Sequence, residues 1–298
     1  MKTKRPRNQE AATKGCRRRL RWIMTCAAAG ILLAPGAGTA GMPQPAVVYY
    51  GQARDSFGWP YREGADVVLR AGTNEIARHS IAGSLSPGVN FALHAPIDDG
   101  RDGTPYVRYA ATTGAVASIV VVDGRGERAI LENAGMPPIG KPGEVVRINV
   151  TAGLDADGDG IPDEWEWELI RWANDPALGS IHDVRPGDDY DGDGVSNLDE
   201  YRAGTFAFLD YDKFSAEAFW QAANGRLGID FLTVPGKAYW IESASIGLIE
   251  GGFRWEAAAY SPTESGDWRE GPVEGTGDWM TFFVAAGESN LAWRLKVE

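Results

Sequence analysis

Two acidic, glycine-rich stretches of the chain, Asp155–Glu166 and Asp189–Glu200, carry oxygen-bearing side chains at matching positions. They begin 34 residues apart and align without a gap, with such side chains at positions 1, 3, 5, 9 and 12 and glycine at position 6. Ca²⁺ takes roughly six to eight oxygen ligands and needs a sharply curved backbone to gather them. The pattern therefore predicts two twelve-residue calcium loops, named loop one and loop two below.

Each loop position has a distinct predicted part. Aspartates at positions 1, 3 and 5 offer carboxylate oxygens, position 7 offers its backbone carbonyl, and position 9 binds directly or through water. The glutamate at position 12, early in a following helix, closes the site with both oxygens. The predicted ligands are Asp155, Asp157, Asp159, Ile161, Asp163 and Glu166 in loop one, and Asp189, Asp191, Asp193, Val195, Asn197 and Glu200 in loop two.

Two plainer explanations compete with calcium. A solvated acidic turn would explain one loose match, but here glycine and glutamate are both in place in both loops. Mg²⁺ is less favoured, because it prefers a small octahedral shell that keeps several waters. We expect the segment to order only with metal, because its clustered carboxylates repel one another.

The motif order also resembles a known family. D-x-D-G-D-G-I-P-D-E-W-E, a short helix and the turn Asn174–Pro176 precede D-x-D-G-D-G-V-S-N-L-D-E-Y-x-A-G-T. Over residues 154–205 this resembles the paired thrombospondin type 3-like repeats of exported bacterial proteins, which implies two or more Ca²⁺ ions. Phe206 departs from the family, which usually continues with Asp-Pro. The pair is also similar to dockerin modules, although these more often have aspartate at position 12 and usually lie at a chain end.

The first 41 residues have the pattern of an export signal. Residues 1–21 hold nine basic residues and one acidic residue, residues 22–34 are apolar, and residues 35–41 are small. Cleavage is predicted after Ala40 or Gly41. The apolar run is too short to span a bilayer comfortably. The protein is thus expected to be extracellular, periplasmic or on the cell surface, with no transmembrane segment after signal removal.

Removal of this signal changes the composition. Both cysteines, Cys16 and Cys26, leave with it, so no disulfide is expected. The remaining chain has 20 basic and 40 acidic residues, a net charge of −20. Residues 154–200 hold fifteen of these acids against two basic residues. Such acidity argues against nucleic acid as a partner.

Residues 45–152 predict a small β-sandwich, because short strand-forming runs alternate with turn residues. The pattern Gly51-x-Ala53-x-Asp55-x-x-Gly58-x-Pro60-x-x-x-Gly64-Ala65-x-Val67-x-Leu69 resembles carboxypeptidase-regulatory-like, prealbumin-type domains, with Val67 and Leu69 facing one core. The expected strands are Ala46–Gln52, Ala65–Ala71, Glu75–Ser80, Val89–His94, Tyr106–Ala110, Val116–Val122 and Glu144–Val150.

A helix is predicted from Pro162 to Ala173, because apolar residues recur there at helical spacing. Its apolar face, with Ile161, Trp165, Leu169 and Trp172, should pack on a second short helix around Leu198 and Tyr201 that stops at Gly204.

Residues 206–222 form an aromatic connector with possible helical character, and strands are expected again from residue 227. The order of Val234-Pro-Gly-Lys-x-Tyr239, a strand with Glu242-Ser243 and a final Trp293-Arg-Leu-Lys-Val297 resembles a small β-sandwich at the ends of exported multidomain bacterial proteins. The expected strands are Leu227–Val234, Lys237–Ser243, Phe253–Ala258, Trp279–Val284 and Leu291–Val297. Trp240, Trp255, Trp279 and Trp293 lie on these strands and are predicted to be core residues, whereas Trp59 and Trp268 lie in loops and are predicted to be exposed.

Catalysis is not predicted. The three histidines, His79, His94 and His182, fall in different segments, and no nucleophile–base, zinc-protease or phosphate-loop motif is present. The clustered carboxylates are accounted for by calcium.

The expected fold class is mainly β, with two small β-sandwich domains joined by a short helical, EF-hand-like or thrombospondin type 3-like calcium-binding segment. The expected boundaries are 1–41, 45–152, 153–205 and 206–298. The predicted function is an exported, non-catalytic, calcium-binding structural or adhesive protein with a cell-surface glycan or protein partner. The alternatives are a carbohydrate-binding module that uses exposed tryptophan, and a dockerin-like assembly module.

Overall fold

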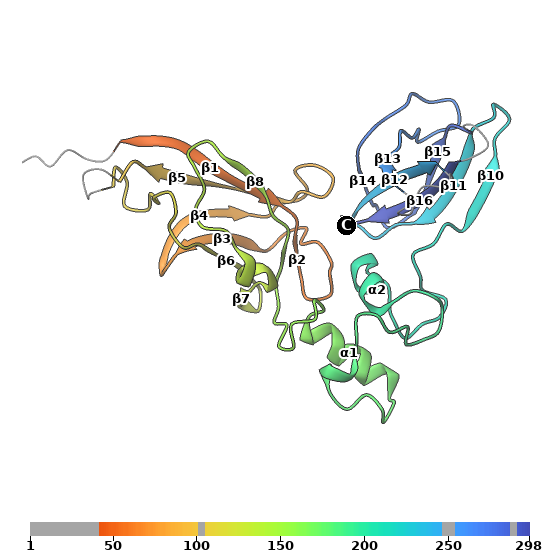
Figure 1. Cartoon of the computed structure of the whole chain (residues 1–298), viewed down its shortest axis with the longest axis horizontal. Coiled ribbons are helices and arrows are strands. Elements are labelled where there is room, and N and C mark those ends of the chain that lie inside the picture. The colour runs from red at the N-terminus through yellow and green to blue at the C-terminus, as the bar shows by residue number, and fades with distance from the viewer. Residues whose placement is uncertain (1–41, 101–104, 246–253, 287–290) are drawn as a thin grey trace, which may run out of the picture. The chain divides into compact units, whose positions relative to one another are not determined.

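The computed structural model describes residues 42–100, 105–245, 254–286 and 291–298 (Figure 1). The predicted export signal and the start of the predicted strand Phe253–Ala258 lie outside these residues. The described chain is mainly β, with several small sheets and two short α-helices, α1 (Asp163–Ala173) and α2 (Asn197–Ala203).

The N-terminal β region, residues 43–151, contains three sheets. One antiparallel sheet has the order β4-β3-β6-β7, a second has the order β5-β1-β8, and β2 pairs in parallel with β9. The strands are β1 (Pro43–Gly51), β2 (Ala53–Arg54), β3 (Asp66–Ala71), β4 (Asn74–Ser80), β5 (Phe91–Asp98), β6 (Ser118–Asp123), β7 (Gly126–Ala129), β8 (Val145–Arg147) and β9 (Val150–Thr151), and a 3₁₀ helix covers Leu131–Gly135.

The core of this region follows from side-chain alternation. Val67 and Leu69 on β3 point to one side of their sheet and are fully buried in one hydrophobic cluster, as predicted. The same cluster takes Tyr49 of β1 and Leu93 of β5. The two larger sheets therefore share one core.

The predicted strand Tyr106–Ala110 is wrong, because these residues form bends and turns. The Asp98 carboxylate at the end of β5 accepts hydrogen bonds from the backbone N–H of Gly100 at 2.8 Å and of Tyr106 at 2.9 Å. A carboxylate that holds two nearby amides in this way fixes a turn rather than a strand.

The C-terminal β region, residues 218–297, contains two sheets. One is antiparallel with the order β10-β11-β15 (Figure 1), and the other has β12 paired with β13, β14 and β16. The strands are β10 (Ala218–Gln221), β11 (Leu227–Leu232), β12 (Ala238–Ser245), β13 (Glu256–Ala257), β14 (Val273–Glu274), β15 (Trp279–Val284) and β16 (Leu291–Val297). Strands β15 and β16 have the predicted bounds.

The connector after α2 is not helical. The Phe206 amide donates to the Asp212 carboxylate at 3.1 Å, which closes a turn, and the chain then enters β10. The aromatic residues of the connector lie in turns, in irregular segments and on an edge strand, and Phe214 packs against the C-terminal core.

Three of the four tryptophans predicted as core residues lie elsewhere. Trp279 is 60% exposed, and Trp240 and Trp255 are only half-buried. Tyr239 and Ile241 take the core positions of β12, so Trp240 between them points to the other face. Trp293 alone packs against the C-terminal core.

The N-terminal core gives a direct stability test. We expect Leu69→Ala, at a fully buried site, to reduce the free energy of unfolding by about 2–5 kcal/mol. Leu85→Ala is the matched control, because Leu85 is 56% exposed, and it should change stability by less than about 0.5 kcal/mol. Urea unfolding in saturating calcium measures both. Equal losses would contradict the assignment of Leu69 to the core.

Candidate metal centre

The backbone turns identically in the two loops. Gly160 and Gly194, at position 6 of each loop, have φ values of 97° and 96°, a conformation that favours glycine. In each loop the position-1 carboxylate accepts a hydrogen bond from the position-6 glycine amide, Asp155 from Gly160 at 3.0 Å and Asp189 from Gly194 at 2.9 Å. The repeated sequence thus folds into a repeated geometry.

This curvature gathers the aspartates. In loop one, one carboxylate oxygen from each of Asp155, Asp157 and Asp159 lies within 4.8 Å of the others. Loop two gathers three further aspartates in the same way, namely Asp189, Asp191 and Asp193. The two aspartate triads could each hold a metal ion.

The position-12 glutamates are the deciding feature of the site. Glu166 on α1 and Glu200 on α2 are both fully buried. Neither oxygen of Glu166 has a hydrogen-bond partner, and Oε2 of Glu200 has none. Buried carboxylates without partners are rare, because burial without compensation is costly. Together with the carboxylates of the aspartate triads, they offer the oxygen ligands that a hard cation such as Ca²⁺ prefers.

The electrostatics place these glutamates beside the aspartates. Burial and then repulsion from Asp157 and Asp159 raise the pKa of Glu166 to about 8. Burial and then repulsion from Asp191 and Asp193 raise the pKa of Glu200 to about 8. A divalent cation between these carboxylates would reverse the effect, since it favours the charged form of each.

The remaining predicted ligands differ between the loops. Asn197, at position 9 of loop two, is buried, and its Oδ1 has no hydrogen-bond partner while its Nδ2 donates to the carbonyl of Arg185 at 2.9 Å. Asp163, at position 9 of loop one, accepts instead from the Ala156 amide at 2.7 Å. The backbone carbonyls of Ile161 and Val195 stay predicted ligands.

One basic side chain lies beside each triad. His182, on a short 3₁₀ helix between the loops (Ile181–Asp183), has Nδ1 3.1 Å from Oδ2 of Asp157. The Nζ of Lys213 lies 3.9 Å from Oδ2 of Asp193 and donates to its backbone carbonyl at 3.1 Å. Sequence spacing places His182 in the inter-loop turn but carries no signal for Lys213.

The helices that carry the two glutamates pack on each other. Trp165 of α1 and Tyr201 of α2 meet edge-to-face, with ring centroids 6.0 Å apart. Both belong to a small cluster with Leu169, as the helical spacing predicts. Trp172 lies outside this cluster, is 60% exposed and stacks on Phe208. Helix α2 ends at Gly204, with φ of 81°, as predicted.

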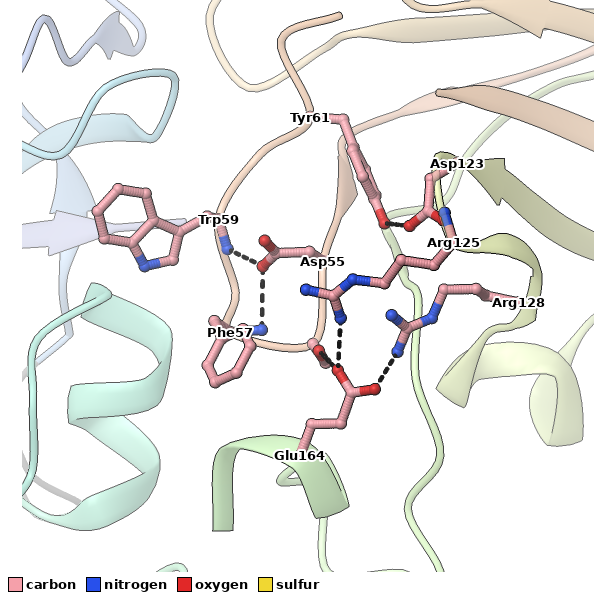
Figure 2. A network of polar contacts seen from close by, with 9 residues as sticks. Asp55, Phe57, Trp59, Tyr61, Asp123, Arg125, Arg128 and Glu164 are labelled. Carbon is pink, nitrogen blue, oxygen red and sulfur yellow. Dashed lines mark hydrogen bonds and ion pairs between the residues drawn. The ribbon is translucent and has the colours of Figure 1, made fainter. Parts of the chain in front are cut away.

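Glu164, two residues before Glu166, ties α1 to the N-terminal β region (Figure 2). Its carboxylate accepts from the guanidinium groups of Arg128 at 2.8 Å and Arg125 at 3.3 Å, and from the Ser56 hydroxyl. Burial opposes ionisation, but the hydrogen bonds from Ser56 and Arg128 outweigh it and lower the pKa of Glu164.

Lys237 connects α2 to the C-terminal β region. This lysine is fully buried, and its Nζ donates to the backbone carbonyl of Arg202, in the last turn of α2, at 2.6 Å. Burial, reinforced by Arg54, lowers the pKa of Lys237 to about 7. Nothing in the sequence marks Glu164 or Lys237 for these contacts, because both depend on pairings between distant segments.

No known protein family, curated protein or solved structure matches this chain. The resemblance to thrombospondin type 3 repeats, dockerins and carboxypeptidase-regulatory-like domains therefore stays a prediction from the motifs. Neither the length nor the hydropathy of any helix among the described residues is that of a membrane span.

Replacement of a buried glutamate should separate metal binding from calcium-free stability. We expect Glu166→Gln to weaken calcium binding at one site by at least about tenfold, since an anionic ligand is lost. The same change should raise the stability of the calcium-free chain near neutral pH, because the neutral amide needs no proton uptake when it is buried. Calorimetric calcium titration and thermal unfolding in chelator measure the two effects.

Glu168→Gln is the control on the same helix, because Glu168 accepts from Trp172 at 2.5 Å and pairs with Arg171 rather than facing the triad. Equal calcium binding by wild type and Glu166→Gln would contradict the assignment of Glu166 as a ligand.

The raised pKa values predict that the calcium-free chain loses stability as the pH rises. The folded-state pKa of Glu166 and Glu200 is about 8, and the unfolded-state pKa is about 4.3. Between these values the folded, calcium-free chain holds protons that the unfolded chain lacks. Its stability should therefore fall as pH rises from about 5 to about 8. Saturating calcium displaces these protons and should abolish the fall. Melting temperatures at both pH values test this, and equal slopes with and without calcium would contradict it.

Proposed function

We propose that this chain is an exported, non-catalytic calcium-binding protein in which two loaded loops rigidify the connection between two β-sandwiches. The observation that carries the proposal is the burial of Glu166 and Glu200 with unpartnered carboxylate oxygens beside the aspartate triads. A cation in each loop would satisfy these oxygens and remove the repulsion. The dissociation constant for calcium should be of the order of 10⁻⁴–10⁻³ M, as in extracellular modules.

The contacts of the two ligand-bearing helices support a linking role. Glu164 on α1 bonds to side chains of the N-terminal β region, and α2 receives a hydrogen bond from Lys237 of the C-terminal region. Calcium would fix the position of each helix through its glutamate. This linkage and the predicted export signal support a structural or adhesive role at the cell surface.

A dockerin-like assembly module is a weaker alternative. Dockerins more often have aspartate at position 12 and usually lie at a chain end. Here position 12 is Glu166 or Glu200, and the C-terminal β region follows the two loops.

The linking role predicts that calcium narrows the range of distances between the two β regions. Spin labels on Thr73→Cys and Ser265→Cys, both exposed sites, would report this distance in a chain with Cys16 and Cys26 replaced by serine. We expect a narrow distance distribution with calcium and a broad one in chelator, measured by pulsed electron resonance.

Asp155→Asn plus Asp189→Asn should leave the distribution broad at all calcium concentrations. Asp175→Asn plus Asp188→Asn, which removes the same charge outside the loops, should behave as wild type. A distribution that calcium binding leaves unchanged would overturn the linking role, while absence of binding would overturn the metal site itself.

A further inference from the structure

The outer face of the sheet β10-β11-β15 carries exposed tryptophans. Ile229, Phe231 and Phe282 fill the C-terminal core from one face of this sheet. Alternate residues point to the opposite face, and residues paired across antiparallel strands share a face. The pairing therefore places a second set together on the outer face, namely Trp220, Gly228, Phe283, Asp230, Thr281, Leu232 and Trp279.

Trp220 is held flat against the sheet with part of its ring open. It pairs with Gly228, where an added Cβ would lie 2.5 Å from the indole, so only glycine lets the ring lie this close. The Phe283 ring also meets the Trp220 indole edge-to-face, with the two ring centroids 5.9 Å apart and the ring planes at 86°. The side chain is still 38% exposed. A ring that is fixed and partly open loses little conformational entropy when a ligand stacks on it.

Trp279 forms a second aromatic surface at the other end of the face. It is 60% exposed and pairs with Leu232, which is 50% exposed. Leu232 lies four positions after Gly228 on β11, which corresponds to roughly 13 Å along the strand. A ligand that reaches both tryptophans must therefore be longer than one sugar ring.

Polar groups lie between the two tryptophans. Asp230 and Thr281 pair across the strands, and the threonine hydroxyl donates to Oδ1 of Asp230 at 2.5 Å. Carboxylate and hydroxyl oxygens are the groups that bond sugar hydroxyls. Aromatic rings with polar groups between them match a sugar chain, whose rings present C–H faces and whose edges present hydroxyls.

The other sheet uses its tryptophans differently. The Lys296 ammonium lies 5.3 Å from the Trp240 ring, and the Arg294 guanidinium lies 4.6 Å from the Trp255 ring. Arg226 similarly covers the loop residue Trp268 at 4.3 Å. In the described part of the chain no cation lies over Trp220 or Trp279. Both rings on this face are therefore open to a ligand.

The charge of this part of the chain disfavours an anionic partner. Residues 206–298 contain 7 basic and 14 acidic residues, a net charge of −7. An anionic polymer would be repelled by this surface. A neutral polymer gains the stacking and hydrogen bonds without that repulsion.

We propose that the outer face of β10-β11-β15 binds a neutral, extended polysaccharide, with its sugar rings on Trp220 and Trp279 and its hydroxyls on Asp230 and Thr281. This site lies outside the calcium loops and goes beyond the linking role proposed above. It uses two tryptophans of one sheet rather than the loop residues Trp59 and Trp268, which the sequence predicts to be exposed.

Affinity electrophoresis of the full chain tests the proposal, with gels that contain mixed-linkage β-glucan, xyloglucan, galactomannan or arabinoxylan, and with cellulose and chitin pull-downs. We expect at least one polymer to retard the protein. Trp279→Ala should weaken that binding on the order of tenfold, as truncation of a central aromatic contact does. Trp172→Ala is the matched control, because Trp172 on α1 is also 60% exposed.

Two further measurements keep the result interpretable. Trp279→Phe should restore much of the binding, and unchanged thermal unfolding of Trp279→Ala would exclude loss of the fold. The binding should persist in chelator, so its failure is distinguishable from failure of the calcium proposal.

Four outcomes would overturn the proposal. These are no binding to any of the six polymers, equal effects of Trp279→Ala and Trp172→Ala, binding only to an anionic polymer such as alginate in a further gel, or concentration-dependent dimerisation that Trp279→Ala abolishes. The last result would assign the face to a second copy of this chain.

Discussion

The placement of two carboxylates, those of Glu166 and Glu200, is the constraint on which the middle of this structure depends. Both are buried beside aspartate triads without a compensating partner for every oxygen. Removal of a charged carboxylate from water costs several kcal/mol in a protein. The positive end of α1 offsets only about 1 kcal/mol of that cost. Protons or a cation must supply the remainder, so the geometry of the loops and the packing of α1 on α2 depend on what fills them.

The consequence extends beyond the loops because each ligand-bearing helix also carries a contact to a β region. Glu164 lies two residues before Glu166, and Arg202, whose carbonyl accepts from Lys237, lies two residues after Glu200. A short helix moves as a rigid unit, so a shift of either glutamate also shifts the neighbouring contact. The Trp165–Tyr201 pair then couples one helix to the other. Two ions are therefore sufficient, in the proposed function, to fix a chain of contacts between distant strands.

Local patterns in the sequence predict the parts of this structure that local interactions determine. The loop residues, the helix from residue 163 and the strands Trp279–Val284 and Leu291–Val297 follow from spacing and alternation. The strand predicted at Tyr106–Ala110 fails because the Asp98 side chain captures the Tyr106 amide from eight residues away. The network around Glu164 and the lysine at α2 could not be predicted, since they join residues that only the tertiary fold brings together. The set of metal ligands stays a prediction.

The tryptophans show why burial is harder to predict than strand position. The residue opposite each tryptophan on the neighbouring strand accounts for its environment. Trp220 faces Gly228 and lies flat, Trp240 faces Lys296 and is covered by it, and Trp279 faces Leu232 and stays exposed. Strand propensity is the same in all three cases, and only the pairing register distinguishes them. The exposure of indole rings on this face therefore depends on the strand register. A shift of one residue in β15 would turn Trp279 toward the core and take its ring off the outer face.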